Sequence, residues 1–137
     1  MVWRLTAGAA VALNGVAISP KSIRFSQTSV EGVQEIAASM RTHGWQGAPI
    51  DVGRMADGGL TSVDNTRLLA AHRAGIDVRA VVHPSDEALP ADLIQRFTTS
   101  AGVPQTWGDA IGLRIGKQDA PFRRTFPSGS PFTGSAE

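Results

Sequence analysis

The residues best suited to chemistry lie in the segment 57–67, where short polar side chains, an aspartate and an arginine follow a glycine-rich turn. Asp64 precedes a helical pattern, and Arg67 lies one turn into it. The free N–H groups and positive dipole end of a helix N-terminus bind anions, phosphate above all. A guanidinium fork suits phosphate, and a carboxylate suits a metal ion. The segment therefore predicts a phosphate site at the start of a helix.

The same segment also has a purely structural interpretation. Asp and Ser at a helix start are commonly caps that accept hydrogen bonds from free backbone N–H groups. Arg67 can form a structural ion pair with a nearby carboxylate, and the candidates are Asp51, Asp57 and Asp64. Local chemistry alone leaves the functional and the structural interpretations open.

The histidines and the other acids form no recognised catalytic signature. His43, His72 and His83 lack the HxxxH and HExxH spacings of a helical zinc site, and we interpret each as more often structural. Four aspartates lie near predicted strand ends, but their spacing does not force them to converge on a metal: Asp51, Asp57, Asp64 and Asp77. The chain has neither a GxxxxGK[ST] phosphate loop nor a legible Ser-His-Asp triad.

Composition indicates one globular domain. The chain has 137 residues, of which 42% are hydrophobic and 18% charged. A net charge of +1 does not by itself indicate a nucleic-acid binder, and it does not exclude a local basic groove. The absence of cysteine excludes disulfides and thiolate metal sites. The apolar run 7–18 is too short for a membrane span, and Asn14-Gly15 within it favours a hairpin over a targeting segment.

Periodicity and turn chemistry predict alternating strands and helices. Thr28 and Glu31 fit a capping box, Asp57-Gly58-Gly59 is a strong turn signal, and Gly75 can close a helix. The predicted elements are strands over 8–13, 16–19 and 23–25, a helix over 28–43 that ends at Gly44, a hairpin over 49–63, a helix over 64–74 capped by Ser62 or Asp64, a strand over 76–82, and helices beginning near Pro90 and Thr106. This order predicts a small α/β (α+β) domain with a mixed sheet and packed helices.

The domain is expected to span 1–118, followed by a Pro/Gly/Ser-rich tail over 119–137. The tail composition is typical of an extended or poorly ordered terminus. Its phenylalanines indicate that part of it packs down onto the domain: Phe122, Phe126 and Phe132.

Three stretches, 44–52, 57–76 and 78–82, together resemble the ParB/sulfiredoxin fold. That fold's pattern is a Pro-Ile-x-Val strand, an acidic-glycine turn, a small polar motif ending in Arg, an Ala-rich helix, a Gly and an apolar strand. A closer resemblance is to ParB-like modules at the C-termini of bacterial polymorphic toxins. It is carried by Ser26-Gln27, by the segment 60–67 and by the Trp-Gly-Asp-Ala-Ile run at 107–111, and it covers about residues 16–130.

The resemblance implies that a nucleotide or another phosphate binds at the helix start after the hairpin. It matches Arg67 to a phosphate-contacting arginine and Asn65 to a residue that helps catalysis or coordination. The chain departs from the family in having no cysteine, which excludes sulfiredoxin chemistry. It also has Asp-Asn-Thr-Arg at 64–67 where the chromosome-partition branch has Gly-Glu-Arg-Arg, and no helix-turn-helix domain follows.

The leading hypothesis is a toxin-type enzyme that acts on a phosphate-containing substrate. Within this class, the favoured activity is that of a nuclease that cleaves DNA. Arg67 would clamp phosphate, and Asp64 would hold a divalent metal such as Mg²⁺ or orient the attacking water. Asn65 is a further catalytic candidate, and His72 is a reserve for proton transfer. The residues expected to hold the phosphate are Ser26, Gln27, Ser62 and Thr66.

Two alternatives remain open. One is a domain that binds or hydrolyses nucleotides without cutting nucleic acid, and the other is a non-enzymatic interaction module in which Asp64 and Arg67 form a structural pair. The expected partners are a nucleic-acid or nucleotide substrate and, by resemblance, a cognate immunity protein. The resemblance further implies a soluble, delivered or secreted bacterial effector that acts in the target-cell cytoplasm, with no membrane segment.

Overall fold

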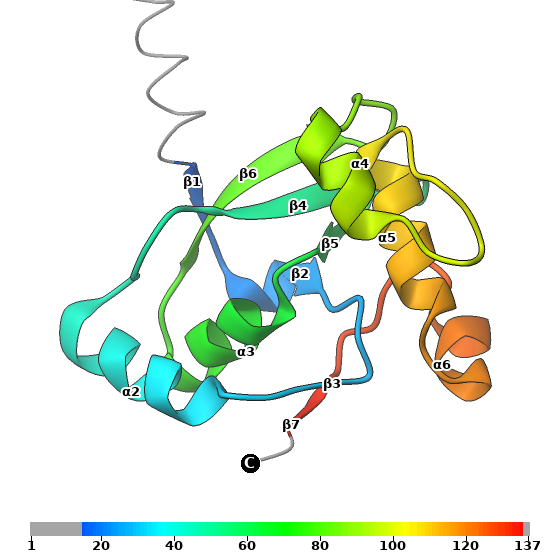
Figure 1. Cartoon of the computed structure of the whole chain (residues 1–137). Helices are drawn as coiled ribbons and strands as arrows, with labels where there is room; N and C mark the ends of the chain where they lie inside the picture. The colour runs from blue at the N-terminus through cyan, green and yellow to red at the C-terminus, as the bar shows by residue number, and fades with distance from the viewer. Residues whose placement is uncertain (1–14, 136–137) are drawn as a thin grey trace, which may run out of the picture.

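The computed structural model in Figure 1 describes residues 15–135 and is built around one mixed sheet. Within this range the sheet has five strands in the order β1-β6-β4-β5-β2. They are β1 (Val16–Ile18), β6 (Val78–Pro84), β4 (Ile50–Arg54), β5 (Leu60–Ser62) and β2 (Ile23–Arg24). β4 is parallel to β6 and antiparallel to β5, while β1 and β2 form the two edges. A mixed sheet with packed helices confirms the predicted α/β class.

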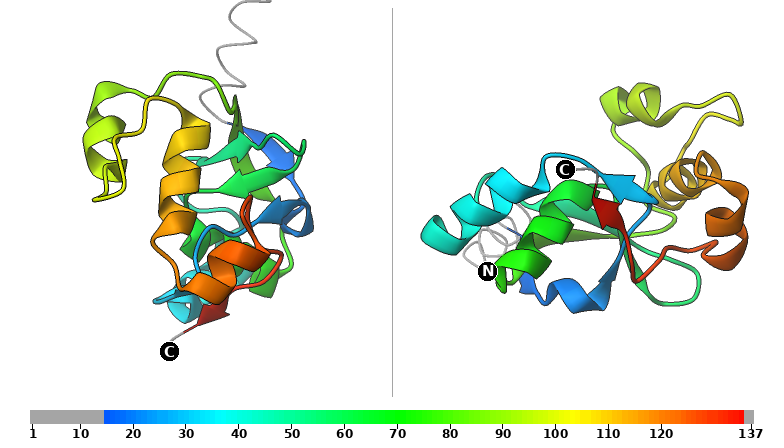
Figure 2. Two further views of the ribbon diagram at one scale, coloured as in Figure 1. Left: turned by 90° about the vertical axis from the view of Figure 1, so that its right-hand side faces the viewer. Right: turned by 90° about the horizontal axis from the view of Figure 1, so that it is seen from below.

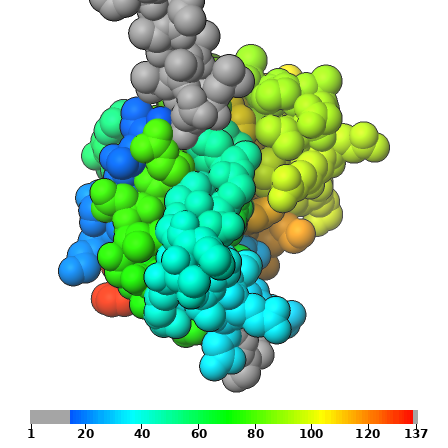
Figure 3. All heavy atoms as spheres, turned by 90° about the vertical axis from the view of Figure 1, so that its left-hand side faces the viewer, coloured from blue at the N-terminus to red at the C-terminus, as the bar shows by residue number. Residues whose placement is uncertain are grey.

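One face of the sheet is covered by two helices, α2 (Val33–His43) and α3 (Asn65–Ala74). The short η1 turn (Pro20–Ser22) also packs on α3. Figure 2 shows the two long helices side by side, and Figure 3 shows α2, in cyan, covering much of this side of the molecule. Alternate strand residues point toward them because successive side chains of a strand face opposite sides. The core of this layer includes Met40, Ile50, Val52 and Leu68.

The other face carries α4 (Ala91–Phe97), α5 (Trp107–Gly116) and α6 (Ala120–Thr125), which lie together away from α2 and α3 (Figure 2). The Ile111 side chain occupies the space that a side chain at Gly53 would need. This close approach explains why the apolar alternation of β4 slips at Gly53. A second core cluster holds the layer together, and it includes Val63, Leu89, Phe97, Trp107, Ile111, Ile115 and Phe122.

The helix predicted over 28–43 begins five residues later than expected. α2 starts at Val33 after Gly32, whose φ of 73° lies in the left-handed region. The Thr28 hydroxyl, expected to cap the helix, instead donates to Gln118 Oε1 at 3.1 Å. Ser29–Val30 forms β3, which pairs in parallel with β7 (Gly134–Ser135). The capping-box prediction is therefore wrong, because a distant pairing overrides local helix preference.

The segment after residue 118 is more ordered than its composition predicts. Asp119 accepts a hydrogen bond from the Phe122 backbone N–H at 2.9 Å and so caps α6, and Phe122 is buried. Ser130 is also buried, and its backbone bonds reciprocally with that of Phe25. Only part of the expected aromatic packing occurs, because Phe132 remains 73% exposed. The prediction of an extended or poorly ordered terminus is wrong for 120–125.

Other local predictions are confirmed. The hairpin over 49–63 forms from β4 and β5, α3 is capped by Asp64 and closed by Gly75, and Thr106 caps α5. Residues 16–18 form the predicted strand, but its proposed hairpin partner at 8–13 lies outside the described residues. Among the helices of residues 15–135, none has the length and apolarity needed to cross a membrane.

Candidate functional site

The predicted phosphate clamp at the start of α3 is engaged with partners inside the domain. Asp64 Oδ1 accepts from the Arg67 backbone N–H at 3.1 Å, and its Oδ2 accepts from Arg67 Nε at 2.7 Å. Arg67 Nη1 donates to the carbonyls of Gln46 and Ala48, and the guanidinium lies 5.1 Å from the centre of the Trp45 ring. The side chain is 24% exposed. Arg67 therefore ties the loop before β4 to the start of α3.

The other polar residues predicted at this end form one buried network. Asn65, which is 1% exposed, accepts from the Ser26 backbone N–H at 2.7 Å and donates to Ser26 Oγ and Gln27 Oε1, both at 3.0 Å. Ser26 Oγ donates to the Ser62 carbonyl, and Ser62 Oγ accepts from the Asp64 backbone N–H. The structure thus brings the predicted residues together. Their mutual hydrogen bonds fix the loop after β2 on α3, and contact with a substrate stays a prediction.

His72 and Thr66 do not join this network. Thr66 is half-buried on the first turn of α3. His72 lies two turns farther along, where its ring stacks on Phe25 at a centroid distance of 5.6 Å and lines a pocket beside Leu69 and Phe132. Burial of the ring lowers the pKa of His72. The structure therefore places the reserve proton donor away from Asp64 and Arg67.

Three of the four aspartates that the sequence analysis names each bond a separate residue, and Asp77 lines a different pocket beside Pro20 and Gly75. Asp51 bonds His83, and Asp57 bonds Arg24, whose hydrogen bonds hold the pKa of Asp57 far below its ordinary value. Asp64 bonds Arg67. Across residues 15–135, no group of three or more His, Asp or Glu side chains is placed to hold a metal ion. A metal at Asp64 stays a prediction without supporting ligands in this range.

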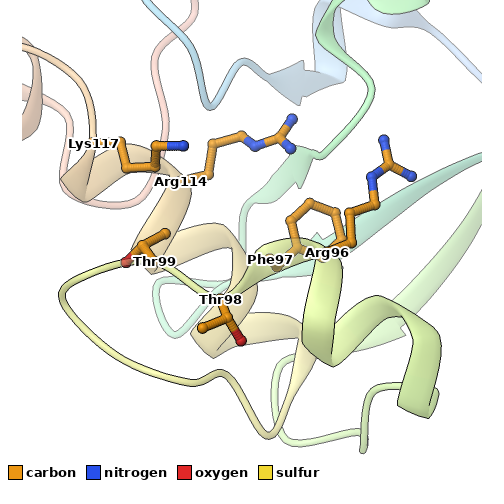
Figure 4. Close-up of a pocket in the computed structure, with 6 residues that line it drawn as sticks. All are labelled: Arg96, Phe97, Thr98, Thr99, Arg114 and Lys117. Carbon is orange, nitrogen blue, oxygen red and sulfur yellow. The ribbon is translucent and has the colours of Figure 1, made fainter.

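A basic pocket between α4 and α5 was not predicted from the sequence. It has a volume of about 30 Å³, which exceeds the roughly 10–15 Å³ that one water needs. Its lining residues, drawn in Figure 4, are Arg96, Phe97, Thr98, Thr99, Arg114 and Lys117. Three of the six are cationic, so the electrostatic potential of the pocket is positive.

An aromatic ring holds the two guanidinium groups of this pocket. The Phe97 ring is buried, with Arg96 Cζ at 5.3 Å and Arg114 Cζ at 5.0 Å from its centre. Arg114 Nη1 donates to the Val63 carbonyl at 2.9 Å, which fixes the orientation of that guanidinium. Burial lowers the pKa of Arg114, and the nearby charge of Arg96 adds to this effect. Arginine nevertheless keeps its proton in proteins, so the positive charge persists.

These cations lack compensating carboxylates. Among the described residues, no Asp or Glu lies within ion-pair distance of Arg96, Arg114 or Lys117. The charge of Asp64 acts on Arg114 through space, but Asp64 bonds Arg67 directly. Like charges without a counter-ion attract an anion, and guanidinium groups match phosphate geometry. Arg114 is partly buried, whereas Arg96 and Lys117 are exposed.

A second titratable cluster anchors the layer that carries the pocket. His83 Nε2 lies 2.8 Å from Asp51 Oδ1, its Nδ1 contacts Glu87, and its ring stacks on Trp107 at 4.0 Å. Only the imidazolium form donates to both carboxylates. Burial by itself lowers the pKa of His83, but the hydrogen bonds to Asp51 and Glu87 outweigh it, and the net pKa is raised. The cluster joins the sheet to the loop before α4 and to the start of α5.

One feature of the sequence indicates the basic pocket, namely an arginine on the apolar face of α5. Trp107, Ile111 and Ile115 repeat at four-residue spacing, and Arg114 falls on the same helical face, seven residues after Trp107. An arginine on a core-facing stripe is unusual and marks a charge that needs explanation. No local pattern, however, pairs Arg114 with Arg96, which lies 18 positions earlier.

No family model matches this chain, and neither a curated protein nor a solved structure matches it. The resemblance to the ParB/sulfiredoxin fold and to toxin modules therefore stays a prediction, carried by Ser26-Gln27 and the segment 57–67.

Proposed function

We propose that this domain is a toxin-type, ParB-like enzyme that acts on a phosphate-containing substrate, and that cleavage of a nucleic-acid phosphodiester is its reaction. In this proposal the substrate phosphate binds in the basic pocket between α4 and α5. The observation that carries the proposal is that Arg96, Arg114 and Lys117 line one pocket with no carboxylate partner among residues 15–135.

The pocket supplies preorganised positive charge. Arg114 is anchored at one nitrogen by the Val63 carbonyl, and its other N–H groups make no hydrogen bond within the described part of the chain. Phe97 keeps Arg96 beside it. Fixed guanidinium groups stabilise the charge that develops on phosphate oxygens during transfer, without reorganisation at the moment of reaction. This is the contribution we assign to Arg96 and Arg114.

The pocket also adjoins the residues to which the resemblance points. Val63, whose carbonyl Arg114 binds, immediately precedes Asp64, and its backbone N–H donates to the Asp51 carbonyl. Ser26, Ser62 and Asn65 do not line the pocket, and they are linked to it through the turn that carries the Val63 carbonyl. The roles of Asp64 and Asn65 in this proposal are therefore to position the 62–65 turn.

Divalent metal chemistry is not part of the proposed steps. Both Asp64 oxygens accept hydrogen bonds from Arg67, and within residues 15–135 no group of three acidic or histidine ligands surrounds them. The residues present at this position do not fit a metal site built by the protein alone, so we assign the charge stabilisation to the guanidinium groups.

A second candidate is nucleotide binding without cleavage of nucleic acid. The pocket, at about 30 Å³, has room for no more than one phosphate group, which a free nucleotide can supply as well as a strand. Titration with ATP, CTP and GTP, with and without magnesium, followed by incubation with plasmid DNA, separates the two functions. Tight nucleotide binding with intact DNA would support the second candidate.

The decisive experiment compares two charge-reducing variants. Arg96→Gln combined with Lys117→Gln changes two exposed cations of the pocket, and Arg41→Gln changes an exposed arginine on α2 that donates to the Arg73 carbonyl. We expect the pocket variant to lose phosphate-ligand binding, plasmid cleavage and growth inhibition in bacteria, while Arg41→Gln retains all three. If the folded pocket variant keeps binding and cleavage at the level of Arg41→Gln, the proposed function is wrong.

A further inference from the structure

The basic pocket continues into a line of cations that reaches α6. Lys117 follows Arg114 by three positions at the C-terminal end of α5, a spacing that places both on the same side of a helix. Arg123 of α6 donates from Nη1 to the carbonyl of Gln118, the residue next to Lys117, at 2.8 Å. We name Arg96, Arg114, Lys117 and Arg123 the cationic track.

The sequence from Arg96 onward is rich in cations, although Asp86, Glu87 and Asp92 lie just before it. Residues 96–135 contain five Lys or Arg and two Asp or Glu, a net charge of +3, although the whole chain carries only +1. The remaining residues therefore carry −2. The two carboxylates are used locally, because Asp109 accepts from the Gln105 backbone N–H and Asp119 from that of Phe122. Neither forms an ion pair with the cationic track among the described residues.

We infer that the cationic track binds the sugar–phosphate backbone of a nucleic-acid strand, with one phosphate in the basic pocket and the next phosphates on Lys117 and Arg123. The inference rests on the proposed function in one respect, that the pocket receives a phosphate. Cations spaced along two consecutive helices fit a strand, whose phosphates are spread along its length, better than a mononucleotide, whose phosphates are all at one end.

The surroundings of the track indicate contact with the backbone rather than with bases. The neighbouring rings of Phe97 and Phe122 are 5% and 8% exposed, so neither offers a face on which a base can stack, and the half-buried Phe126 ring packs against Phe122. The one strongly exposed aromatic residue in the described range, Phe132, lies beside His72 at the other pocket. We therefore expect binding that is independent of sequence and sensitive to salt.

The expected salt dependence is quantitative. Each phosphate neutralised on a single strand contributes about −0.7 to the slope of log K against log salt, so four contacts predict a slope of about −2.8. Removal of one contact should change the slope by about 0.7 and weaken binding about fivefold near 0.1 M salt. Arg123→Gln removes one such cation without altering the pocket.

The experiment measures fluorescence anisotropy of labelled oligothymidylates between roughly 50 and 200 mM NaCl, the range over which counterion release changes the affinity strongly. A 5′-phosphorylated dinucleotide probes the pocket, and a strand of about 12 nucleotides probes the track. Arg41→Gln is the matched control, because it removes an equally exposed arginine that also donates to one backbone carbonyl, but on α2. We expect Arg123→Gln to weaken binding of the long strand only, and Arg41→Gln to weaken neither.

Three results would overturn the inference. In the first, Arg123→Gln and Arg41→Gln change the affinity for the long strand equally. In the second, the long strand binds no tighter than the dinucleotide, and in the third, poly-glutamate displaces the strand as readily as unlabelled strand does. Failure of the proposed function is distinguishable, because dinucleotide binding would then be insensitive to Arg96→Gln with Lys117→Gln. If the dinucleotide responds to the pocket variant but the long strand ignores Arg123→Gln, only the track is wrong.

Discussion

The start of α3 and the basic pocket between α4 and α5 differ in how their charges are compensated. At α3, Arg67 pairs with Asp64 and donates to two backbone carbonyls, and the buried Asn65 accepts a hydrogen bond from the Ser26 backbone N–H. At the basic pocket, Arg96 and Arg114 share a phenylalanine and no carboxylate in the described range. The polar groups at the start of α3 bond one another or nearby carbonyls, whereas the cations of the basic pocket have no carboxylate partner in the described range.

This difference also bears on stability. The Asp64–Arg67 pair is partly exposed, so its net contribution to folding is small. Burial of Arg114 beside Arg96 works against folding, because both desolvation and like charge disfavour the ionised form. Proteins retain such local conflicts mostly where function requires them. Four predictions test the contrast between a structural polar site and an uncompensated one.

The largest expected effect is on folding and comes from Asn65→Ala. The substitution leaves the buried Ser26 backbone N–H without its acceptor, and an unsatisfied buried group costs about 1–3 kcal/mol. It also removes the donor to the Ser26 hydroxyl, which keeps its own bond to the Ser62 carbonyl. We expect the free energy of unfolding, measured by urea denaturation, to fall by about 3 kcal/mol. Thr66→Ala, at the neighbouring half-buried position, is the control. Equal stabilities of the two variants would contradict the structural role of Asn65.

The next effect separates affinity from stability at the basic pocket. Arg96→Gln removes a cation that has no carboxylate partner among residues 15–135, so it should weaken phosphate-ligand binding about tenfold. The free energy of unfolding should stay equal or rise slightly, because repulsion from Arg114 is relieved. Isothermal calorimetry and urea denaturation give the two quantities. If Arg96→Gln lowers the free energy of unfolding but leaves the ligand affinity unchanged, Arg96 has a structural role and not a binding role.

A smaller effect is expected for Arg67→Ala. The variant loses a partly exposed ion pair and two bonds to carbonyls, which should lower the free energy of unfolding by about 1 kcal/mol. Because its guanidinium is directed at Trp45 and not at the basic pocket, ligand affinity should match that of the parent protein. If the Arg67→Ala protein keeps its stability but no longer binds phosphate, the sequence-based prediction that Arg67 binds the phosphate is supported instead.

The smallest effect concerns pH. The raised pKa of His83 means that its stabilising contribution is complete below the unfolded-state value of about 6.5 and is lost as pH rises through the folded-state value. The lowered pKa of His72 acts in the opposite sense, with stability lost as pH falls. Urea denaturation across the range above pH 6.5 should therefore show a decline that His83→Gln removes. An unchanged decline in His83→Gln would show that His83 does not anchor the α5 layer.

Local rules of the chain determined several elements by themselves. The glycine turn at 57–59 predicts the hairpin, Asp64 and Gly75 predict both ends of α3, and Thr106 predicts the start of α5. These features depend on hydrogen bonds that span two to four residues, so their partners are visible side by side in the sequence. The α/β class follows from the same elements.

Contacts between distant segments decided the rest. Thr28 leaves its expected cap for Gln118, 90 positions away, and Asp51 meets His83, 32 positions away. The meeting of Arg96 and Arg114 on Phe97 likewise exists only once α4 and α5 pack together. Sequence patterns report the face on which a side chain lies but not which distant charge it will face. The sequence therefore predicted the polar residues at the start of α3. Tertiary packing decided that these residues bond one another, and that the cations of the basic pocket have no carboxylate partner in the described range.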